Sequence, residues 1–326
     1  MNIMKLGVLT VATYDKTLEE AAKYLSGLGV QALEIGAGGC PGNTHLNPDD
    51  YLGKPEKIAE FKAMLKKYNL EVPALSCHGN CVHPKKEIAA KFQADFEKTV
   101  LLAEQMGIDT IVTFSGCPGG SEVDMTPNWA VCPWPEDFLE VLDYQWNKVL
   151  IPYWKEAVKF ANAHGVKKIA LEMHPGFCVY NPETCLKLRE AVGDTIGANV
   201  DPSHLFWQGI DIVAAIRKLG EAGAIYHFHA KDTKIDPINC GVNGVLDTKH
   251  YSDEIHRSWI FRSVGYGHDL QTWKDIISNL RLVGYDGIIS IEHEDSLMTG
   301  KEGLEKAIAF LKETIIFESK GDMWWA

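Results

Sequence analysis

IALEMHP (169–175) is one of four stretches in the second half of the chain that decide its fold; the others are IGANVDPSH (196–204), AIYHFHAKD (224–232) and IISIEHED (288–295). Each stretch begins as an apolar, β-favouring run and becomes polar at its C-terminal end. In a (β/α)8 barrel the C-terminal ends of the strands form one face, and the active site lies there. The polar residues that end these four runs are therefore expected to meet; they are Glu172, Asp201, His229 and Glu292.

The rest of the chain alternates between strand and helix patterns in the same way. Further strands are predicted at 5–10, 30–36, 70–79 and 108–116, and helices at 18–29, 56–69, 89–106, 138–163, 182 onward, 212–219, 270–282 and 303–315. Eight strand-then-helix units predict an α/β fold, a single (β/α)8 TIM barrel domain over residues 1–326, with long loops after strands four and seven at 117–137 and 233–267. A doubly wound open sheet is the alternative, but VATYDKT (11–17) lacks the glycine-rich phosphate loop that such a sheet carries after its first strand.

Composition limits the classes of function. The formal net charge of −12 argues against nucleic-acid binding, which requires a basic surface. The eight cysteines are scattered and form no Cys-x-x-Cys pair, which favours free thiols in a reducing compartment. No apolar run approaches the roughly 20 residues that a bilayer span needs. A soluble, cytoplasmic protein without a membrane or nucleic-acid partner is expected, and its oligomeric state stays open.

The four converging residues predict a metal site. Three carboxylates and one imidazole would repel one another, and a bound divalent cation is the simplest remedy. The donors are mostly hard oxygens, which favours Mn2+ or Mg2+ over Zn2+. Two of the residues also have an ordinary alternative: Glu172 as a salt-bridge partner and Asp201 as the cap of the helix that DPSH begins.

Further polar side chains share this end of the predicted barrel. His174 lies on the same strand face as Glu172, and His227 alternates with His229. Lys231 either holds a substrate oxygen or anion, or pairs with Asp232 or a barrel carboxylate. The other candidates are His78, as a substrate contact or a core histidine, and Glu34, as a substrate contact or a partner of a lysine.

The order of these polar residues along the chain resembles that of a known family. A strand-end Glu, then DPSH, then His-x-Lys-Asp, then a second strand-end Glu is similar to the xylose isomerase-like TIM barrel superfamily, in particular its sugar phosphate isomerase/epimerase group. The resemblance implies one divalent ion, most often Mn2+ with Mg2+, Co2+ or Zn2+ as alternatives, held by Glu172, Asp201, His229 and Glu292. It also implies that His204 binds a substrate oxygen. The relative endonuclease IV needs further histidines that this chain lacks, so DNA repair is not expected.

The resemblance and the paired carboxylates together predict proton transfer next to a carbonyl of a sugar, keto-sugar or sugar phosphate. Glu172 and Glu292 are the expected acid and base, working through an enediolate that a bound metal stabilises. The expected substrate contacts are His204, His174, His78, Lys231 and Arg262, with apolar walls from Trp134, Phe206, Trp207 and Trp259. The alternatives are a metal-dependent lyase that uses the same site, either an inosose-type dehydratase or a 3-keto-glycoside-cleaving enzyme, and a non-catalytic sugar-binding barrel.

Overall fold

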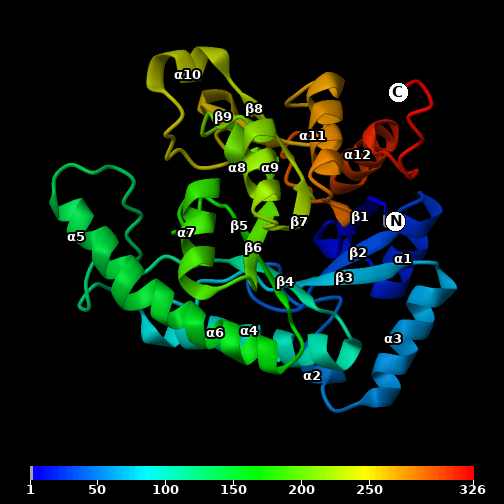
Figure 1. The fold of residues 1–326 in the computed structure, drawn as a ribbon, viewed down its shortest axis with the longest axis horizontal. Coiled ribbons are helices and arrows are strands. Elements are labelled where there is room, and N and C mark those ends of the chain that lie inside the picture. Colours follow the sequence, from blue (N-terminus) through cyan, green and yellow to red (C-terminus); the bar gives the residue numbers. More distant parts are fainter. Residues whose placement is uncertain (1–2) are drawn as a thin grey trace.

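Eight parallel strands close into a barrel, in the order β1-β10-β7-β6-β5-β4-β3-β2 (Figure 1). The structure, a computed structural model, describes residues 3–326. The barrel strands are β1 (Lys5–Leu9), β2 (Ala32–Gly36), β3 (Glu71–Ser76), β4 (Thr110–Phe114), β5 (Lys168–Glu172), β6 (Ile196–Val200), β7 (Ile225–Ala230) and β10 (Ile288–Ile291). Because β1 pairs with both β2 and β10, the sheet has no open edge and the doubly wound alternative is wrong. The predicted (β/α)8 fold is confirmed.

Helices follow the strands and surround the barrel (Figure 1). They are α1 (Leu18–Gly27), α2 (Pro48–Tyr51), α3 (Pro55–Lys67), α4 (Lys86–Met106), α5 (Asp137–Asp143), α6 (Ile151–Ala163), α7 (Pro182–Val192), α8 (Pro202–Phe206), α9 (Ile212–Glu221), α10 (Pro237–Asn243), α11 (Leu270–Leu282) and α12 (Gly300–Thr314). Local signals set several of their ends. Thr17 and Glu20 form a capping box at the start of α1, and Asp269 caps α11.

The helix expected at 138–163 is divided. Between α5 and α6 the chain forms a π-helical segment, Tyr144–Leu150. Pro152, in the first turn of α6, has no N–H to donate to the carbonyl four residues earlier, so regular α-helical bonding cannot run through this point. Gln145 in the π segment donates through Nε2 to the carbonyl oxygens of Pro118 (3.1 Å) and Asn128 (2.5 Å) and so anchors the long loop after β4.

The long segment after β7 is an ordered extension. The strands β8 (Asp232–Ile235) and β9 (Trp259–Arg262) pair antiparallel, and α10 lies between them in sequence. The Asp232 carboxylate accepts hydrogen bonds from the backbone N–H groups of residues 265, 267 and 268 and so joins the two ends of the extension. At Gly267 a Cβ would lie 2.3 Å from the carbonyl oxygen of Thr233, so the closure requires glycine.

The inside of the barrel is apolar near its N-terminal end and polar near the opposite end. Buried polar residues of β2, β3, β7 and β10 point into it; they are Glu34, Ser76, His227, His229 and Ser290. This places a hydrogen-bonded layer beneath the C-terminal face. Within residues 3–326, none of the helices combines the length and apolarity that crossing a membrane requires.

Candidate metal centre

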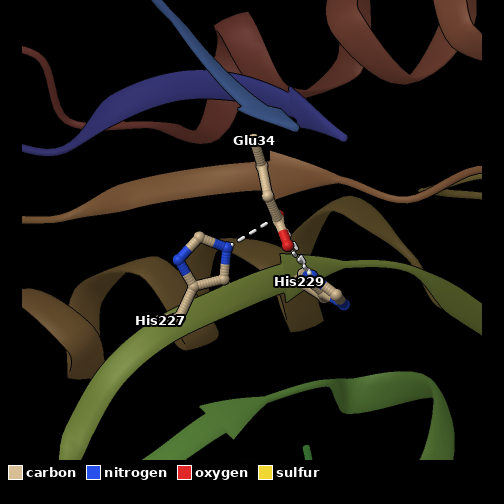
Figure 2. A group of neighbouring side chains, drawn as sticks. All are labelled: Glu34, His227 and His229. Atoms are coloured by element: carbon tan, nitrogen blue, oxygen red, sulfur yellow. Dashed lines mark hydrogen bonds and ion pairs between the residues drawn. The ribbon is translucent and has the colours of Figure 1, made fainter. Parts of the chain in front are cut away.

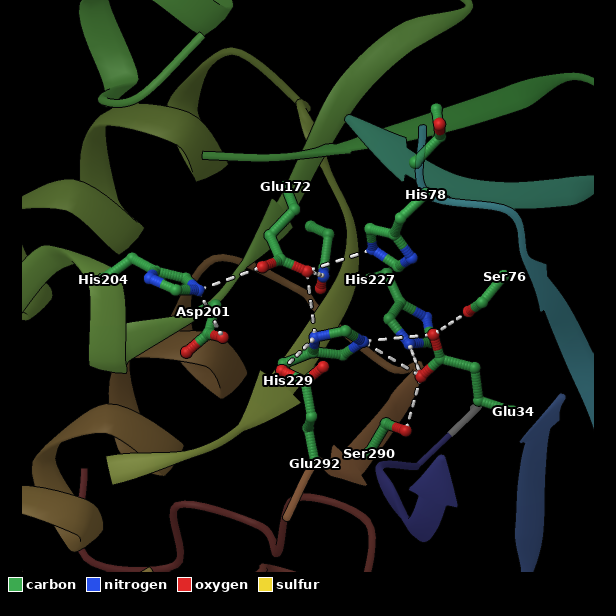
Figure 3. Close-up of polar contacts among 12 residues, drawn as sticks. Glu34, Ser76, His78, Glu172, Asp201, His204, His227, His229, Ser290 and Glu292 are labelled. Atoms are coloured by element: carbon green, nitrogen blue, oxygen red, sulfur yellow. Dashed lines mark hydrogen bonds and ion pairs between the residues drawn. The ribbon is translucent and has the colours of Figure 1, made fainter. Parts of the chain in front are cut away.

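The C-terminal face brings together the four residues that the strand-end pattern singled out (Figure 3). One ligand atom from each of Glu172, Asp201, His229 and Glu292 lies within 4.8 Å of those of the other three. Glu172 ends β5, His229 belongs to β7, and Asp201 and Glu292 directly follow β6 and β10. Glu172, Asp201 and His229 are buried, whereas the Glu292 side chain is 18% exposed.

His229 is central to this group. Its Nδ1 lies 3.2 Å from Glu172 Oε2 and 3.4 Å from Glu292 Oε2. Its other ring nitrogen, Nε2, faces away from the group and lies 3.1 Å from both oxygens of Glu34. The imidazole therefore presents one nitrogen to the cluster and the other to the barrel interior.

The charges in the cluster do not balance without a cation. Burial raises the pKa of Asp201 to about 7, and the nearby carboxylates of Glu172 and Glu292 add to this. Burial alone would lower the pKa of His229, but the carboxylates, Glu34 first, hold it well above its ordinary value. A site that suppresses the ionisation of one carboxyl and attracts a proton to its imidazole is one in which a divalent ion would be stabilised.

Two polar atoms of the cluster support the same conclusion. His229 Nδ1 and Asp201 Oδ2 are buried and make no hydrogen bond; the groups near them are ion-pair partners, with Glu172 Oε2 3.2 Å from His229 Nδ1 and Lys231 Nζ 3.2 Å from Asp201 Oδ2. The other oxygen of Asp201, Oδ1, accepts from the backbone N–H of Ser203 at 2.8 Å, so the predicted helix cap is also present. Since buried polar atoms are rarely left unpaired, and three carboxylates with one imidazole are suitable donors, the residues fit a divalent metal ion.

Two further histidines contact Glu172. His78 Nε2 lies 3.1 Å from Glu172 Oε2, and His204 Nε2 lies 3.1 Å from Glu172 Oε1. Asn199, which the sequence did not single out, donates through Nδ2 to Glu172 Oε2 at 3.2 Å. The Glu172 carboxylate is therefore held on both oxygens, and burial is outweighed by the histidines, which keep its pKa well below its ordinary value.

Lys231 is buried among carboxylates on the same face. Its Nζ lies 2.6 Å from Glu292 Oε2, 3.0 Å from Glu294 Oε2 and 3.2 Å from Asp201 Oδ2. Of the two expectations for Lys231, the ion pair with barrel carboxylates is present. The predicted partner Asp232 instead joins the ends of the extension.

Two small cavities open beside the cluster. One, of about 230 Å³, is lined in part by His78, Phe114, Glu172, Glu292 and Glu294, and the other, of about 290 Å³, is lined by His174, Tyr251, Ile260, Phe261, Glu294 and Ser296. The extension after β7 therefore supplies one wall of the site. The prediction that tryptophans form apolar walls of the site is wrong. The rings of Trp207 and Trp259 stack on each other with their centroids 4.6 Å apart, and Trp134 is 75% exposed.

Arg262 is not among the residues that line these cavities. Its Nε donates to Asp295 Oδ2 at 3.0 Å, and its guanidinium lies over the Tyr266 ring. Arg257 is buried between Tyr251 and Trp259 and bonds to backbone carbonyl groups of the extension. Arg257 thus holds the extension together, and Arg262 joins the extension to the residues after β10. These contacts depend on the folded extension, so sequence alone cannot distinguish them from substrate binding.

Comparison with known proteins shows where this barrel belongs. A family model described as "Xylose isomerase-like TIM barrel" matches residues 22–314. The uncharacterized protein YfiH of Bacillus subtilis (strain 168) is 41% identical over 314 residues, which cover 96% of this chain and 99% of that protein.

Solved structures share the fold at low identity. The structure of D-psicose 3-epimerase in the presence of D-fructose has a TM-score of 0.61 and 15% identity, with 95% of this chain and 99% of that chain covered. The structure of the IOLI protein with a bound zinc atom has a TM-score of 0.62 and 20% identity, with coverages of 95% and 96%. At these identities the likeness shows a common fold.

Proposed function

The chain belongs to the xylose isomerase-like TIM barrel family, and we propose that it is a divalent-metal-dependent sugar isomerase or epimerase. The observation that carries this proposal is the convergence of Glu172, Asp201, His229 and Glu292, a cluster in which two buried atoms make no hydrogen bond. Two of its carboxylates also border a cavity, where they can reach a substrate.

The proposed reaction moves a proton next to a carbonyl group. A divalent ion held by the four residues would supply Lewis-acid stabilisation of the negative charge that develops on the substrate oxygens. Glu172 and Glu292 stand on β5 and directly after β10, strands that β6 and β7 separate in the barrel, and both line the 230 Å³ cavity. One carboxylate removes the proton, and the other returns it to the opposite face of the same carbon or to the neighbouring carbon.

Neighbouring side chains prepare the two carboxylates for these roles. His78 and His204 contact Glu172 on different oxygens and orient it, while Lys231 Nζ holds Glu292 at 2.6 Å. His174 borders the second cavity, where it can meet a substrate hydroxyl group; the His204 ring, whose centroid lies 4.0 Å from that of His174, is buried and lines neither cavity. These fixed partners limit the rearrangement that proton transfer requires.

The cavities favour an uncharged sugar. Among the described residues that line them there is no arginine or lysine, and Glu294 borders both. Lys231 is already surrounded by three carboxylates, and Arg262 is paired with Asp295. A phosphate group usually requires a free cation or a cluster of N–H donors, so a keto-sugar without phosphate is the proposed substrate class.

Two structural relatives are consistent with the proposal. One is described as a 3-epimerase, and the other was solved with zinc. We propose Mn2+ as the most suitable ion for this chain because three of the four donors are carboxylates, with Mg2+, Co2+ and Zn2+ as alternatives.

Exchange with solvent tests the proposed reaction. Chelator-treated protein reloaded with Mn2+ is incubated in D2O with a panel of unphosphorylated keto-sugars, and NMR follows deuterium at the carbons beside the carbonyl. We expect exchange that requires metal and is lost in Glu172→Gln and Glu292→Gln. An epimer or an aldose product separates epimerisation from isomerisation, whereas loss of water or of a glycosidic group would assign a lyase. Sugar binding without exchange, or full turnover after chelation, would contradict the proposal.

A further inference from the structure

Directly beneath the candidate metal centre lies a second group of acidic and imidazole side chains: Glu34, His227 and His229 (Figure 2). Glu34 belongs to β2 and is fully buried inside the barrel. Neither the cavities nor the proposed proton transfer uses it. The sequence placed Glu34 beside the substrate or a lysine, whereas its partners are two histidines of β7.

This lower group is saturated with hydrogen bonds. The Glu34 carboxylate accepts from Ser290 Oγ at 2.6 Å and from Ser76 Oγ, lies 2.8 Å from His227 Nε2, and lies 3.1 Å from His229 Nε2 (Figure 3). Both of its oxygens therefore have more than one donor. A carboxylate filled in this way has no free lone pair for an ion, which distinguishes it from the upper cluster, where two buried atoms make no hydrogen bond.

The position of Glu34 decides which nitrogen of His229 is available to a metal. A carboxylate that only accepts requires a proton on the nitrogen that faces it, which here is Nε2. When His229 is neutral, its lone pair is then on Nδ1, the atom that lies 3.2 Å and 3.4 Å from the carboxylates of Glu172 and Glu292. Without Glu34, either ring nitrogen could carry the proton, and the ring could turn about its bond to Cβ.

We propose that Glu34, supported by His227, Ser76 and Ser290, is a positioning residue that fixes His229 as an Nδ1 ligand of the divalent ion. The inference rests on the proposed function only in that it requires a metal at the upper cluster. A carboxylate behind the imidazole makes it a stronger ligand and lowers the cost of orienting it, and loss of such a partner typically weakens metal binding about 10- to 100-fold. Glu34 thereby connects β2 to a site built from β5, β6, β7 and β10.

Metal binding tests this role without a substrate. Chelator-treated wild type and Glu34→Gln are titrated with Mn2+, and EPR measures the free ion. We expect one ion per chain, bound roughly 10- to 100-fold more weakly by Glu34→Gln. Glu71→Gln, which changes an exposed glutamate at the start of β3 paired with Lys5, is the matched control and is expected to bind like wild type. Glu34→Asp, which keeps the charge but draws it back from His229, serves if Glu34→Gln does not fold and is expected to bind more weakly than wild type.

A spectroscopic readout separates positioning from a general effect on folding. At saturating Co2+ the visible absorption bands report the ligand field, and we expect them to shift in the Glu34 variants but not in Glu71→Gln. Binding within twofold of wild type together with an unchanged Co2+ spectrum would overturn the proposal. So would two ions per wild-type chain, one of them lost in Glu34→Gln, because Glu34 would then be a ligand itself. Absence of Mn2+ binding by the wild type would instead count against the proposed function.

Discussion

Replacing Asp201 by Asn should stabilise the metal-free protein while it weakens metal binding. Asp201 is buried, one of its oxygens makes no hydrogen bond, and burial raises its pKa from 3.8 to about 7. A native carboxyl with a raised pKa is a cost to folding, because the unfolded chain ionises more easily. The Asn side chain has no charge but keeps the Oδ1 acceptor that caps α8 at Ser203.

The magnitude follows from the pKa difference. At about 1.4 kcal/mol per pH unit, a change from 3.8 to about 7 costs up to roughly 4 kcal/mol of unfolding free energy. Below about pH 4 both states are protonated and the cost is absent. Between about pH 4 and 7 the unfolded chain loses the proton that the native state keeps, so native stability falls as pH rises; above about pH 7 the cost is constant. For 326 residues the entropy of unfolding is about 0.7 kcal/mol/K, so 4 kcal/mol corresponds to about 6 °C.

The assay is thermal and urea unfolding of both proteins in chelator at pH 5, 6, 7 and 8. We expect the Asp201→Asn advantage to grow with pH up to about 7 and then to level off. Asp201→Ala should show a smaller advantage by about 1 kcal/mol, since it also loses the helix cap. At saturating Mn2+ the wild type should instead be more stable than either variant, because only the wild type has all four donors. A chelated Asp201→Asn protein that is less stable than wild type at pH 8, or an advantage independent of pH, would refute the reasoning.

Three further outcomes are expected. Mn2+ at 100 times its dissociation constant should raise the wild-type unfolding free energy by about 2.7 kcal/mol, or about 4 °C by calorimetry, and a melting temperature indifferent to Mn2+ would speak against a metal site. Steady-state kinetics on the substrate found by exchange should show kcat reduced about 10²- to 10⁴-fold in Glu172→Gln and Glu292→Gln. A near-normal kcat in one of these variants would show that the replaced glutamate is not part of the acid–base pair. In urea unfolding, Gly267→Ala should lower the free energy of unfolding by about 1–3 kcal/mol, because its Cβ would lie 2.3 Å from a backbone oxygen. The control Gly241→Ala, whose Cβ would have nothing within 4 Å, should change the free energy of unfolding little. Equal effects of the two substitutions would mean that the extension tolerates movement at Gly267.

The barrel could be predicted from sequence because its signals are local. Each apolar run ends in a polar residue, and each helix follows with its own cap, as in the predicted helix 270–282, which the structure contains with the same bounds. The strand-end residues of β5, β6, β7 and β10 needed no knowledge of pairing, since all parallel strands end at one face. Fold and convergence of the four donors therefore follow from the same pattern.

The extension after β7 could not be predicted from the same signals. Its two strands have four residues each and are separated by 23 residues with no hairpin turn signal. Nothing in the sequence indicates that Tyr251 and Phe261 reach a cavity while Trp207 and Trp259 stack on each other. Such choices depend on how the extension folds onto the barrel.

The depth of Glu34 inside the barrel could not be predicted from the sequence either. Glu34 is the middle residue of β2 and Glu172 is the last residue of β5, and Glu34 lies beneath the cluster whereas Glu172 lies within it. Of the side chains that hydrogen-bond to Glu34, Ser76 is the nearest in sequence, 42 residues away. The two histidines that contact Glu34 are 193 and 195 residues away. The stagger of the strands, which sets this depth, comes from closure of the whole barrel.

The two layers of charge have opposite consequences for stability. The Glu34 layer is fully hydrogen-bonded, so it can hold a buried carboxylate and orient His229 at little cost. In the layer above it, His229 Nδ1 and Asp201 Oδ2 make no hydrogen bond, and several carboxylates crowd around Lys231. A rigid lower layer prevents the upper one from relaxing to pair its own atoms, because His229 cannot turn without losing Glu34. At the proposed metal site these unfavourable electrostatics would persist until a cation binds, and the lower layer would keep the donors in place for it.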